Sequence, residues 1–279
     1  MKKVIVLLLA AVLLLSVIGC KKAENKKLTV AMSPDFAPME FVDTSKSGQE
    51  QYVGFDVTLA NFLADELGME LEIKPMSFDA CMTAVQLGSV DMAISGFSWK
   101  PDRAENFLLS DYYIAGDNET QQSVITVKAK ENTCKTQADF SGWKVGAQAS
   151  SLQEQLVKDE LIPAGAELVV YKSIDDAVLA LQTGKIDALA VAHGNGEAII
   201  ANNPDLAFTG FDFDVDPKYE NNVILLNKSN TEMLEKVNQV LAKAMAAGVY
   251  DGWYEDAKAL AGIPTAADVS YDDDGKPVS

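Results

Sequence analysis

Residues 78–91 read Phe-Asp-Ala-Cys-Met-Thr-Ala-Val-Gln-Leu-Gly-Ser-Val-Asp, and residues 174–187 read Ile-Asp-Asp-Ala-Val-Leu-Ala-Leu-Gln-Thr-Gly-Lys-Ile-Asp. The two stretches align without gaps at an offset of 96 residues, with Asp, Ala, Gln, Gly and Asp at the same positions in both. Each is typical of an amphipathic helix that ends at a glycine and leads into a strand. Any α/β chain repeats helices of this kind, but five identities in register favour two lobes of one architecture.

The sequence around these two stretches alternates between strand and helix patterns. In the first half we expect strands at 28–32, 71–76 and 91–95, with helices at 55–67 and 78–87. In the second half we expect strands at 144–148, 168–171 and 186–191, with helices at 152–161 and 174–181. This order predicts an α/β fold of two lobes, each with a mostly parallel sheet flanked by helices.

Two apolar segments join the predicted lobes. Residues 121–128 and 222–227 are β-branched and apolar, which predicts extended hinge strands. An amphipathic helix follows from Thr231 to about Ala247, and we expect the aromatic residues of 249–254 to pack on the first lobe. The predicted division is 28–122 with 223–263 for lobe 1, 123–222 for lobe 2 including the hinge strands, and 264–279 for a disordered acidic tail.

The composition excludes several classes of function. The chain of 279 residues is 48% hydrophobic and 23% charged, which is too apolar for a disordered chain. Its net charge of -18 lacks the basic footprint of a nucleic-acid-binding protein, and its one histidine and three scattered cysteines offer no structural zinc site. We therefore expect a monomer that needs no metal or cofactor and binds no nucleic acid. Whether Cys81 and Cys134 form a disulfide stays open.

The N-terminus predicts export and lipid anchoring. Residues 1–20 have the basic start, apolar run and small-residue end of a secretory signal, and the run is too short to span a membrane. Residues 17–20, Val-Ile-Gly-Cys, resemble a bacterial lipobox, which implies that Cys20 carries acyl chains such as palmitate. The polar residues 21–27 would then tether the protein to the outer face of the cytoplasmic membrane, or within the periplasm.

Several motifs together carry a family resemblance. From residue 28 to about 262 the chain resembles the extracellular (family 3) solute-binding proteins of polar amino-acid ABC importers. The resemblance implies a periplasmic binding protein-like fold, a ligand held between two closing lobes, and a membrane permease as partner. The motifs occur in the family's order at 33–40, 54–57, 88–98, 100–105, 110–113 and 145–151.

The resemblance implies a carboxylate clamp in lobe 1. Arg103 matches the family's carboxylate-binding arginine, and its planar guanidinium can meet both carboxylate oxygens at once. Ser98 and the amide of Phe97 match groups that donate to the same carboxylate. The alternative is a helix-surface arginine paired with Asp102 or Glu105.

The start of a helix in lobe 2 is expected to face this clamp. Gln148, Ser150 and Ser151 stand where a strand meets that helix, a place where free amides and the helix dipole attract anions. Ser150 could equally be a plain N-cap. In lobe 1, the backbone of Ser95 and Gly96 would lie near the ligand amine.

Two aromatic residues match positions whose rings sandwich the ligand side chain. These are Phe36 and Phe78. From periodicity alone either ring could belong to the core, and Phe78 could be a staple at a helix entry. Their joint agreement with the family favours the pocket.

One position departs from the family pattern. Family members usually end the strand that corresponds to 186–191 with an aspartate that pairs with the ligand ammonium, but here the residue is Ala192, followed by His193. Because an unpaired buried ammonium is costly, either another acid supplies the charge or the ligand is not an ordinary α-amino acid. His193 could accept a hydrogen bond as a neutral imidazole, or be an ordinary packed residue. The candidate acids are Glu197, Asp35 and Asp214.

Three classes of function are compatible with the sequence. The favoured one is a non-enzymatic binding protein that captures an amino acid or related small carboxylate for an importer. The alternative is a periplasmic cyclohexadienyl-type dehydratase on the same fold, in which His193, Glu197 or Asp35 would be the general acid. A receptor sensor module is disfavoured, because no membrane span or signalling domain follows the lobes. The acids near the site favour a ligand with a neutral or basic side chain.

Overall fold

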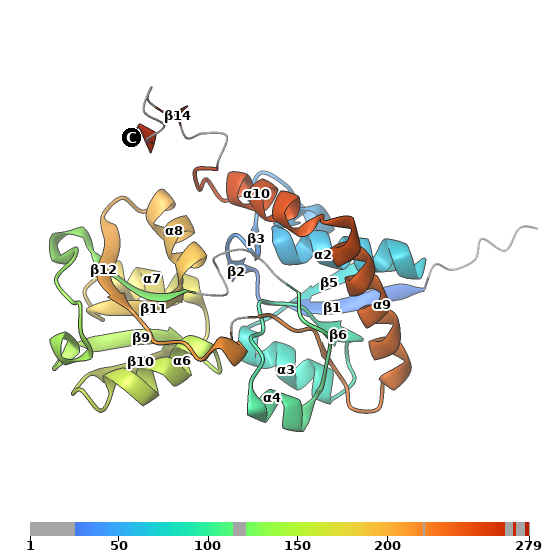
Figure 1. Cartoon of the computed structure of the whole chain (residues 1–279), viewed down its shortest axis with the longest axis horizontal. Helices are drawn as coiled ribbons and strands as arrows, with labels where there is room; N and C mark the ends of the chain where they lie inside the picture. Colours follow the sequence, from blue (N-terminus) through green and yellow to red (C-terminus); the bar gives the residue numbers. More distant parts are fainter. Residues whose placement is uncertain (1–25, 114–120, 220, 266–269, 272–276, 279) are drawn as a thin grey trace, which may run out of the picture.

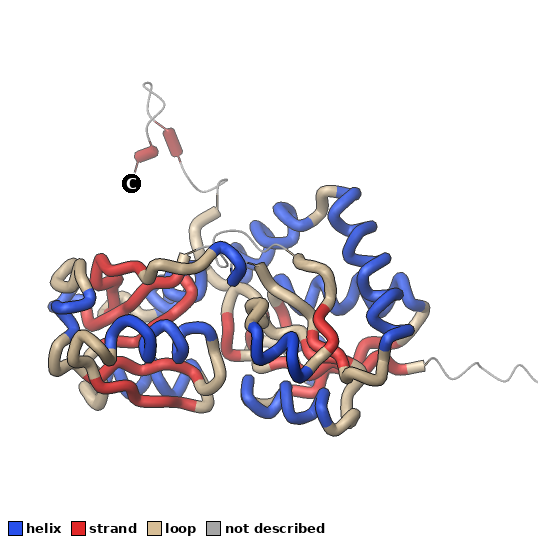
Figure 2. Tube along the Cα trace, turned by 60° about the horizontal axis from the view of Figure 1, so that its bottom comes forward, coloured by secondary structure: helices blue, strands red, loops and turns tan. Residues whose placement is uncertain are grey.

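The computed structural model describes residues 26–113, 121–219, 221–265, 270–271 and 277–278. The predicted signal sequence, Cys20 and all but the end of the tether lie outside these residues. The described chain forms two α/β lobes that lie side by side (Figure 1). In both lobes, helices accompany the strands of one sheet (Figure 2). None of the described helices is long and apolar enough to cross a membrane.

The two sheets have the same topology, which confirms the predicted fold class. The order is β5-β1-β6-β13-β7 in lobe 1 and β10-β9-β11-β8-β12 in lobe 2. In each sheet the fourth strand runs antiparallel to both of its neighbours, and the other pairs are parallel. The strands of lobe 1 are β1 (Lys27–Met32), β5 (Glu70–Pro75), β6 (Met92–Ala93), β7 (Leu108–Leu109) and β13 (Leu225–Leu226). Those of lobe 2 are β8 (Gln122–Val127), β9 (Lys144–Gln148), β10 (Glu167–Tyr171), β11 (Ala188–Ala192) and β12 (Leu206–Asp212).

The five predicted helices lie close to their expected ranges, and the helices at 101–106, 193–202 and 250–260 had no predicted range. In lobe 1 they are α2 (Phe55–Leu67), α3 (Phe78–Gln86), α4 (Pro101–Asn106), α9 (Thr231–Ala247) and α10 (Tyr250–Leu260). In lobe 2 they are α6 (Leu152–Leu156), which continues as a π-helical turn over Val157–Leu161, α7 (Ile174–Gln182) and α8 (His193–Asn202). Helices α2 and α9 end at Gly68 and Gly248, both left-handed with φ of 65° and 63°, a conformation that glycine adopts without steric cost.

Each face of the lobe 1 sheet has its own core. Leu28, Val30 and Met32 of β1 pack with residues of α2, α9 and α10, whereas Ala31 packs with α3. This alternation follows from the two-residue period of a strand. The predicted aromatic contact is confirmed, because Phe55 of α2 lies 6.0–6.3 Å from the rings of three C-terminal aromatic residues. These are Tyr250, Trp253 and Tyr254.

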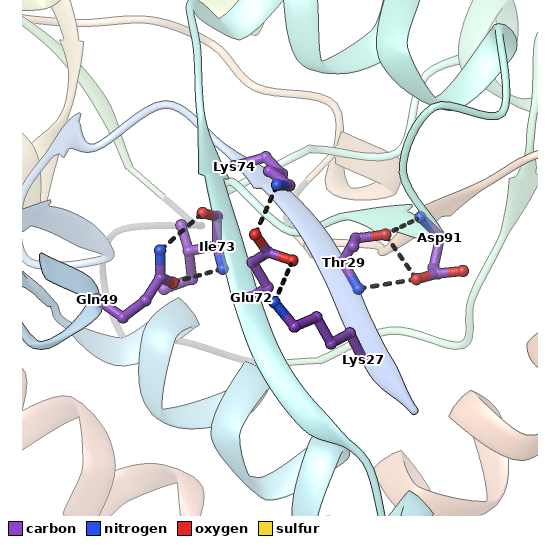
Figure 3. Close-up of polar contacts among 7 residues, drawn as sticks. All are labelled: Lys27, Thr29, Gln49, Glu72, Ile73, Lys74 and Asp91. Carbon is purple, nitrogen blue, oxygen red and sulfur yellow. Dashed lines mark hydrogen bonds and ion pairs between the residues drawn. The ribbon is translucent and has the colours of Figure 1, made fainter. Parts of the chain in front are cut away.

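The repeated aspartates have the same structural role in both lobes. Thr29 N–H donates to Asp91 Oδ2 at 2.7 Å (Figure 3), and Lys144 N–H donates to Asp187 Oδ2 at 3.0 Å. In return, each aspartate N–H donates to the carbonyl of the same partner, at 3.0 Å and 2.8 Å. The loop after the repeated helix is thus tied to the second strand in the sheet order, β1 in lobe 1 and β9 in lobe 2. This explains why Asp recurs in the repeat.

The outer edge of β5 is covered by side-chain contacts. Gln49 donates to the carbonyl of Ile73 at 3.2 Å and accepts from its N–H at 2.7 Å (Figure 3). Glu72 lies between Lys27 and Lys74, with N–O distances of 3.3 Å and 2.7 Å. Satisfied backbone groups and charged side chains at a sheet edge oppose pairing with another chain.

Lobe 1 contains a small sheet that lobe 2 lacks in the described residues. Between β1 and α2 the chain forms β2 (Asp35–Phe36), β3 (Glu40–Val42) and β4 (Tyr52–Val53), whereas β9 leads directly into α6. Gly54 joins this sheet to α2 with φ of 121°, and a Cβ there would lie 2.4 Å from Met39 O. The close approach lets the carbonyls of Pro38 and Met39 accept from the first amides of α2.

One expectation about the connections changes, and the open question of a disulfide is answered. The segments predicted as hinge strands contain β8 and β13, which are the antiparallel strands inside the two sheets. The chain leaves lobe 1 after Tyr113 and returns at Asn222, where Tyr113 N–H donates to Asn222 O at 3.1 Å. Cys81 and Cys134 are both free and buried, so they form no disulfide.

The predicted acidic tail is described only in part. Ser270–Tyr271 (β14) and Pro277–Val278 (β15) form an antiparallel pair. Residues 266–269, 272–276 and 279 lie outside the described residues, so disorder of the tail stays a prediction.

Candidate ligand-binding site

A cavity lies between the lobes, where the carboxyl ends of parallel strands face each other. Ser33 and Gly96 follow β1 and β6, while Gln148 and Ala192 end β9 and β11. Open α/β sheets bind ligands at this edge. The cavity and its mouth together contain ≈ 640 Å³ that no protein atom fills, open solvent included.

Eight of the twelve ligand-binding residues predicted from the sequence line this cavity. They are Phe36, Phe78, Gly96, Ser98, Arg103, Gln148, Ser151 and Ala192. The other four, which do not line it, are Ser95, Phe97, Ser150 and His193.

Arg103 is the only arginine of the chain, and it is 1% exposed. Its Nη1 donates to Ser98 O at 2.5 Å, and its Nη2 donates to Ser150 O in lobe 2 at 3.0 Å. Its Nε is buried without a partner. Neither Asp102 nor Glu105 forms an ion pair with Arg103, and Asp102 lies 4.0 Å from Lys100 instead. Arg103 is therefore not a helix-surface ion pair.

The charge of Arg103 lacks a counter-ion among the described residues. Burial lowers the pKa of Arg103 to about 10, so the side chain is still a cation at neutral pH. An uncompensated buried charge costs several kcal/mol, and an anion in the cavity would remove much of that cost. A carboxylate suits the guanidinium because it can accept two parallel hydrogen bonds.

Two aromatic rings flank the arginine. Phe78 and Phe97 stack at 4.5 Å, and the guanidinium carbon of Arg103 lies 5.5 Å and 5.3 Å from their centroids. Phe97 is fully buried behind Phe78, so only Phe78 reaches the cavity. Phe36 enters from the small sheet and lies against Gly96, where a Cβ would be 2.6 Å from the Phe36 ring.

The turn after β9 differs from the predicted set of free amides. Ser150, with φ of 65°, contacts Arg103 through its carbonyl, and its N–H donates to Glu154 Oε2 at 2.5 Å. Ser151, not Ser150, is the N-cap of α6, because its Oγ accepts from Glu154 N–H at 3.0 Å. The Ser151 hydroxyl in turn donates to Gln148 O at 2.7 Å.

Ser95 belongs to a buried network behind the cavity. Its hydroxyl donates to Glu40, and it accepts from Ser33 N–H at 3.0 Å. Beside Glu40, Asp56 accepts from Gly96 N–H at 2.7 Å and from the Tyr113 hydroxyl at 3.1 Å. The backbone of Gly96, which lines the cavity, is thus held by a buried carboxyl group.

Glu40 and Asp56 are both fully buried and titrate above their ordinary range. Burial raises the pKa of Asp56 to about 7. Burial and the neighbouring Asp56 raise the pKa of Glu40 well above its ordinary value. The pair therefore retains at least one proton at neutral pH, as expected for two carboxyl groups in one apolar site.

His193 is a packed residue of lobe 2. Its ring stacks on Phe208 at 4.6 Å, and its Nδ1 lies 2.9 Å from Ser123 Oγ. Its Nε2 is 4.0 Å from Glu197, whose side chain is partly exposed. The residue that reaches the cavity here is instead Ala192, the last residue of β11, which is 2% exposed.

Asp35 connects the lobes outside the cavity. Its carboxylate accepts from Ile174 N–H at 2.8 Å and from Gln148 Nε2 at 3.3–3.4 Å. Burial raises the pKa of Asp35. Asp214, the third candidate acid, is exposed on the surface. None of the acids considered for the ligand amine lines the cavity.

The chain that forms this cavity and its buried arginine is similar to known proteins. The model of the bacterial extracellular solute-binding proteins, family 3, matches residues 28–256. The chain belongs to this family. A curated relative, the arginine-binding extracellular protein ArtP of Bacillus subtilis, is 28% identical over 247 residues, which cover 86% of this chain and 92% of ArtP.

Solved structures of family 3 proteins are also similar to the chain. An amino acid ABC transporter substrate-binding protein, AbpA, from Streptococcus pneumoniae was solved bound to L-arginine. It is 34% identical with a TM-score of 0.77, and the match covers 89% of this chain and all of that one. A Salmonella typhimurium periplasmic binding protein described for high arginine specificity is 26% identical with a TM-score of 0.73, covering 82% and 99% of the two chains.

Sequence reasoning missed several neutral residues that line the cavity of this family 3 protein. Among the polar ones, Gln153 Nε2 donates to Gln122 Oε1 at 2.5 Å, and Asn195 Nδ2 donates to Ala37 O in lobe 1 at 2.8 Å. For two of the missed residues, the position in the sequence could have indicated the site. Ser33 directly follows β1, and Asn195 lies in the first turn of α8. The full set is Ser33, Gln122, Leu152, Gln153, Ile174, Leu189, Ala190, Val191, Asn195 and Asn222. No group of three His, Cys, Asp or Glu side chains that could hold a metal ion occurs in the part of the chain that the structure describes.

Proposed function

We propose that this family 3 protein is the extracytoplasmic substrate-binding component of an ABC importer and captures an amino acid or related small carboxylate between its lobes. The observation that carries the proposal is Arg103, a buried cation that faces the inter-lobe cavity without an acidic partner. Relatives named for binding arginine and histidine support it.

Ligand capture would proceed by closure of the two lobes. Arg103 binds the carboxylate from lobe 1, and the rings of Phe36 and Phe78 cover the ligand body. Closure then adds bonds between the lobes, from Arg103 to Ser150 O and from Ile174 N–H to Asp35. Micromolar binding requires about -8.2 kcal/mol, which desolvated charge pairing and ring contacts can supply together.

The protein would act by binding alone, and a permease would receive the ligand. The candidate general acids of a dehydratase, His193, Glu197 and Asp35, do not line the cavity. We therefore propose no second activity.

The finer proposal is that the protein is a monomeric lipoprotein. Acyl chains on Cys20 would hold the binding lobes at the outer face of the membrane, beside the permease, through the tether at 21–27. Replacing the thiol in Cys20→Ser should move the protein from the membrane fraction to the soluble fraction. A variant that stays in the membrane fraction would contradict this.

Arg103→Ala tests the central part of the proposal. A ligand at about a hundredfold excess over its Kd should raise the Tm of the wild-type protein by roughly 5–10 °C. Arg103→Ala should lose this shift while its ligand-free Tm stays within about two degrees of wild type, because Arg103 has no ion pair to lose. Differential scanning calorimetry with a panel of amino acids and other small carboxylates measures both.

Lys100→Ala is the matched control. Lys100 is a buried cation three positions away that does not line the cavity, so its removal should leave the ligand-induced shift intact. A collapse of the ligand-free Tm in Arg103→Ala would mean that Arg103 is structural. Equal ligand-induced shifts in Arg103→Ala and wild type would rule out the clamp.

A further inference from the structure

The charge of the cavity wall points to the class of ligand. We propose that the cavity selects a small carboxylate without an α-ammonium group, such as a hydroxy acid or an N-acylated amino acid, over the corresponding α-amino acid. This inference rests on the proposed function and narrows its ligand.

The first support is the chemistry of the wall. Arg103 is the single charged side chain among the described residues that line the cavity. The remaining polar side chains are all neutral, with three serine hydroxyls and five carboxamides. The carboxamides are Gln122, Gln148, Gln153, Asn195 and Asn222. A wall of this kind pairs one negative charge and offers neutral donors and acceptors to everything else.

The second support is that the nearest acids lie outside the cavity lining. Asp35 accepts from the Ser33 hydroxyl at 2.9 Å, from Ile174 N–H at 2.8 Å and from Gln148. Glu40 and Asp56 are fully buried behind the backbone of Ser95 and Gly96. None of these three acids lines the cavity, so an ammonium there would contact none of their carboxyl groups.

The third support is the end of β11. Ala192 lines the cavity, and its methyl side chain can neither accept a hydrogen bond nor carry charge. An α-ammonium that leaves water at this wall loses its hydration and gains no opposite charge, which costs several kcal/mol. A hydroxyl or an acylated nitrogen loses far less, because a neutral carboxamide can satisfy it.

Pairs of ligands with the same skeleton test the inference. Isothermal titration calorimetry on the purified, extensively dialysed protein would compare L-alanine with L-lactate, L-phenylalanine with L-phenyllactate, and L-glutamine and L-arginine with their N-acetyl derivatives. Among the pairs that bind, the member without the ammonium should have a Kd at least about tenfold lower, which corresponds to about 1.4 kcal/mol. Equal or tighter binding of the amino acid in every such pair would overturn the inference.

A substitution at Ala192 tests the cause of the preference. Ala192→Asp places a carboxylate at the end of β11, and Ala192→Asn is its matched control, with nearly the same size and no charge. Ala192→Asp should shift the ratio of the two Kd values toward the amino acid by at least tenfold relative to Ala192→Asn. Equal ratios in the two variants would contradict the proposed role of charge at this wall.

The outcomes separate this inference from the proposed function. If amino acids bind more tightly and Arg103→Ala abolishes their binding, the binding function stands and the inference falls. If no carboxylate binds wild-type protein in any pair, the proposed function falls, and the inference falls with it.

Discussion

The two lobes share one sheet topology but differ in the charge that they bury. All the buried charged side chains of the described residues belong to lobe 1, namely Glu40, Asp56, Lys100 and Arg103. The buried polar side chains of lobe 2 are all neutral, namely Gln122, Ser123, Thr126, Gln148, Ser151, Asn195 and Thr209. The repeat thus specifies a sheet topology that both lobes share. The buried charged side chains come from lobe 1, and lobe 2 contributes neutral polar side chains.

The small sheet of lobe 1 is one structural source of this difference. It brings Phe36 to the cavity and Glu40 to the buried carboxyl pair, and in the described residues lobe 2 has no counterpart. Charges buried during folding need a rigid set of partners. An insertion that surrounds α2 with additional backbone provides these partners in lobe 1 only.

The largest effect is expected for Gly54→Ala, which breaks the junction between this sheet and α2. A Cβ at this position would lie 2.4 Å from Met39 O and 2.7 Å from Pro38 O, in addition to the strain at φ of 121°. We expect a loss of at least about 3 kcal/mol in the free energy of unfolding, measured with urea. Gly252→Ala, in the open middle of α10, should instead stabilise by about 0.5–1 kcal/mol.

Equal stability of Gly54→Ala and wild type would mean that the small sheet is not held against α2 as described. In that case the buried position of Glu40 would also need another explanation.

The second largest effect is expected for the buried carboxyl pair of Glu40 and Asp56, which should make the free energy of unfolding depend on pH. The folded pKa of Asp56 is raised to about 7, and that of Glu40 is also raised, so between pH 5 and 8 the folded state binds more protons than the unfolded state. The free energy of unfolding should therefore fall as the pH rises through this range. Glu40→Gln, which keeps a hydrogen-bonding group beside Asp56, removes one of the two titrating groups and should make this fall smaller.

Glu72→Gln is the control for the general effect of removing a negative charge. Glu72 is a partly exposed carboxylate whose pKa is lowered by Lys74 and Lys27, so it titrates below the buried carboxyl pair. Urea unfolding at several pH values should give the wild-type slope for Glu72→Gln. The same slope in Glu40→Gln would show that the pair does not titrate during unfolding.

A smaller effect on stability is expected for the repeated aspartates, and it tests whether the two lobes share this contact. Asp91→Ala and Asp187→Ala each remove the acceptor of one backbone N–H at the start of a central strand. Each should cost about 1–2 kcal/mol, with the two values within about 0.5 kcal/mol of each other. Urea unfolding curves provide the values. A cost confined to one lobe would mean that the identity in the repeat does not reflect a shared role.

Most of the secondary structure shared by the two lobes could be predicted from the sequence. Helices α2 and α9 begin and end where predicted, because amphipathic periodicity and a terminal glycine are local signals. The antiparallel direction of β8 and β13 could not be predicted, since an extended apolar segment does not encode its direction. The same limit applies to the partner of each strand.

Long-range contacts account for what the sequence did not predict at the site. His193 directly follows β11, which lines the cavity. Its stacking on Phe208 depends on how β12, the next strand along the chain, packs against this position. Glu40 and Asp56 each stand alone among apolar neighbours, and nothing local indicates that they share one buried space. Arg103 could be predicted because its motif is local, whereas the lack of an acidic partner is visible only in three dimensions.

Nuclear magnetic resonance of Arg103 tests the central claim most directly. Because the chain has one arginine, uniformly ¹⁵N-labelled protein has a single guanidinium Nε–Hε signal, and this nitrogen has no protein partner. Titration with the carboxylate that gives the largest thermal shift should move this signal and slow its exchange with water. If that carboxylate stabilises the protein while the signal stays unchanged, the ligand binds elsewhere, and the account of the cavity is wrong.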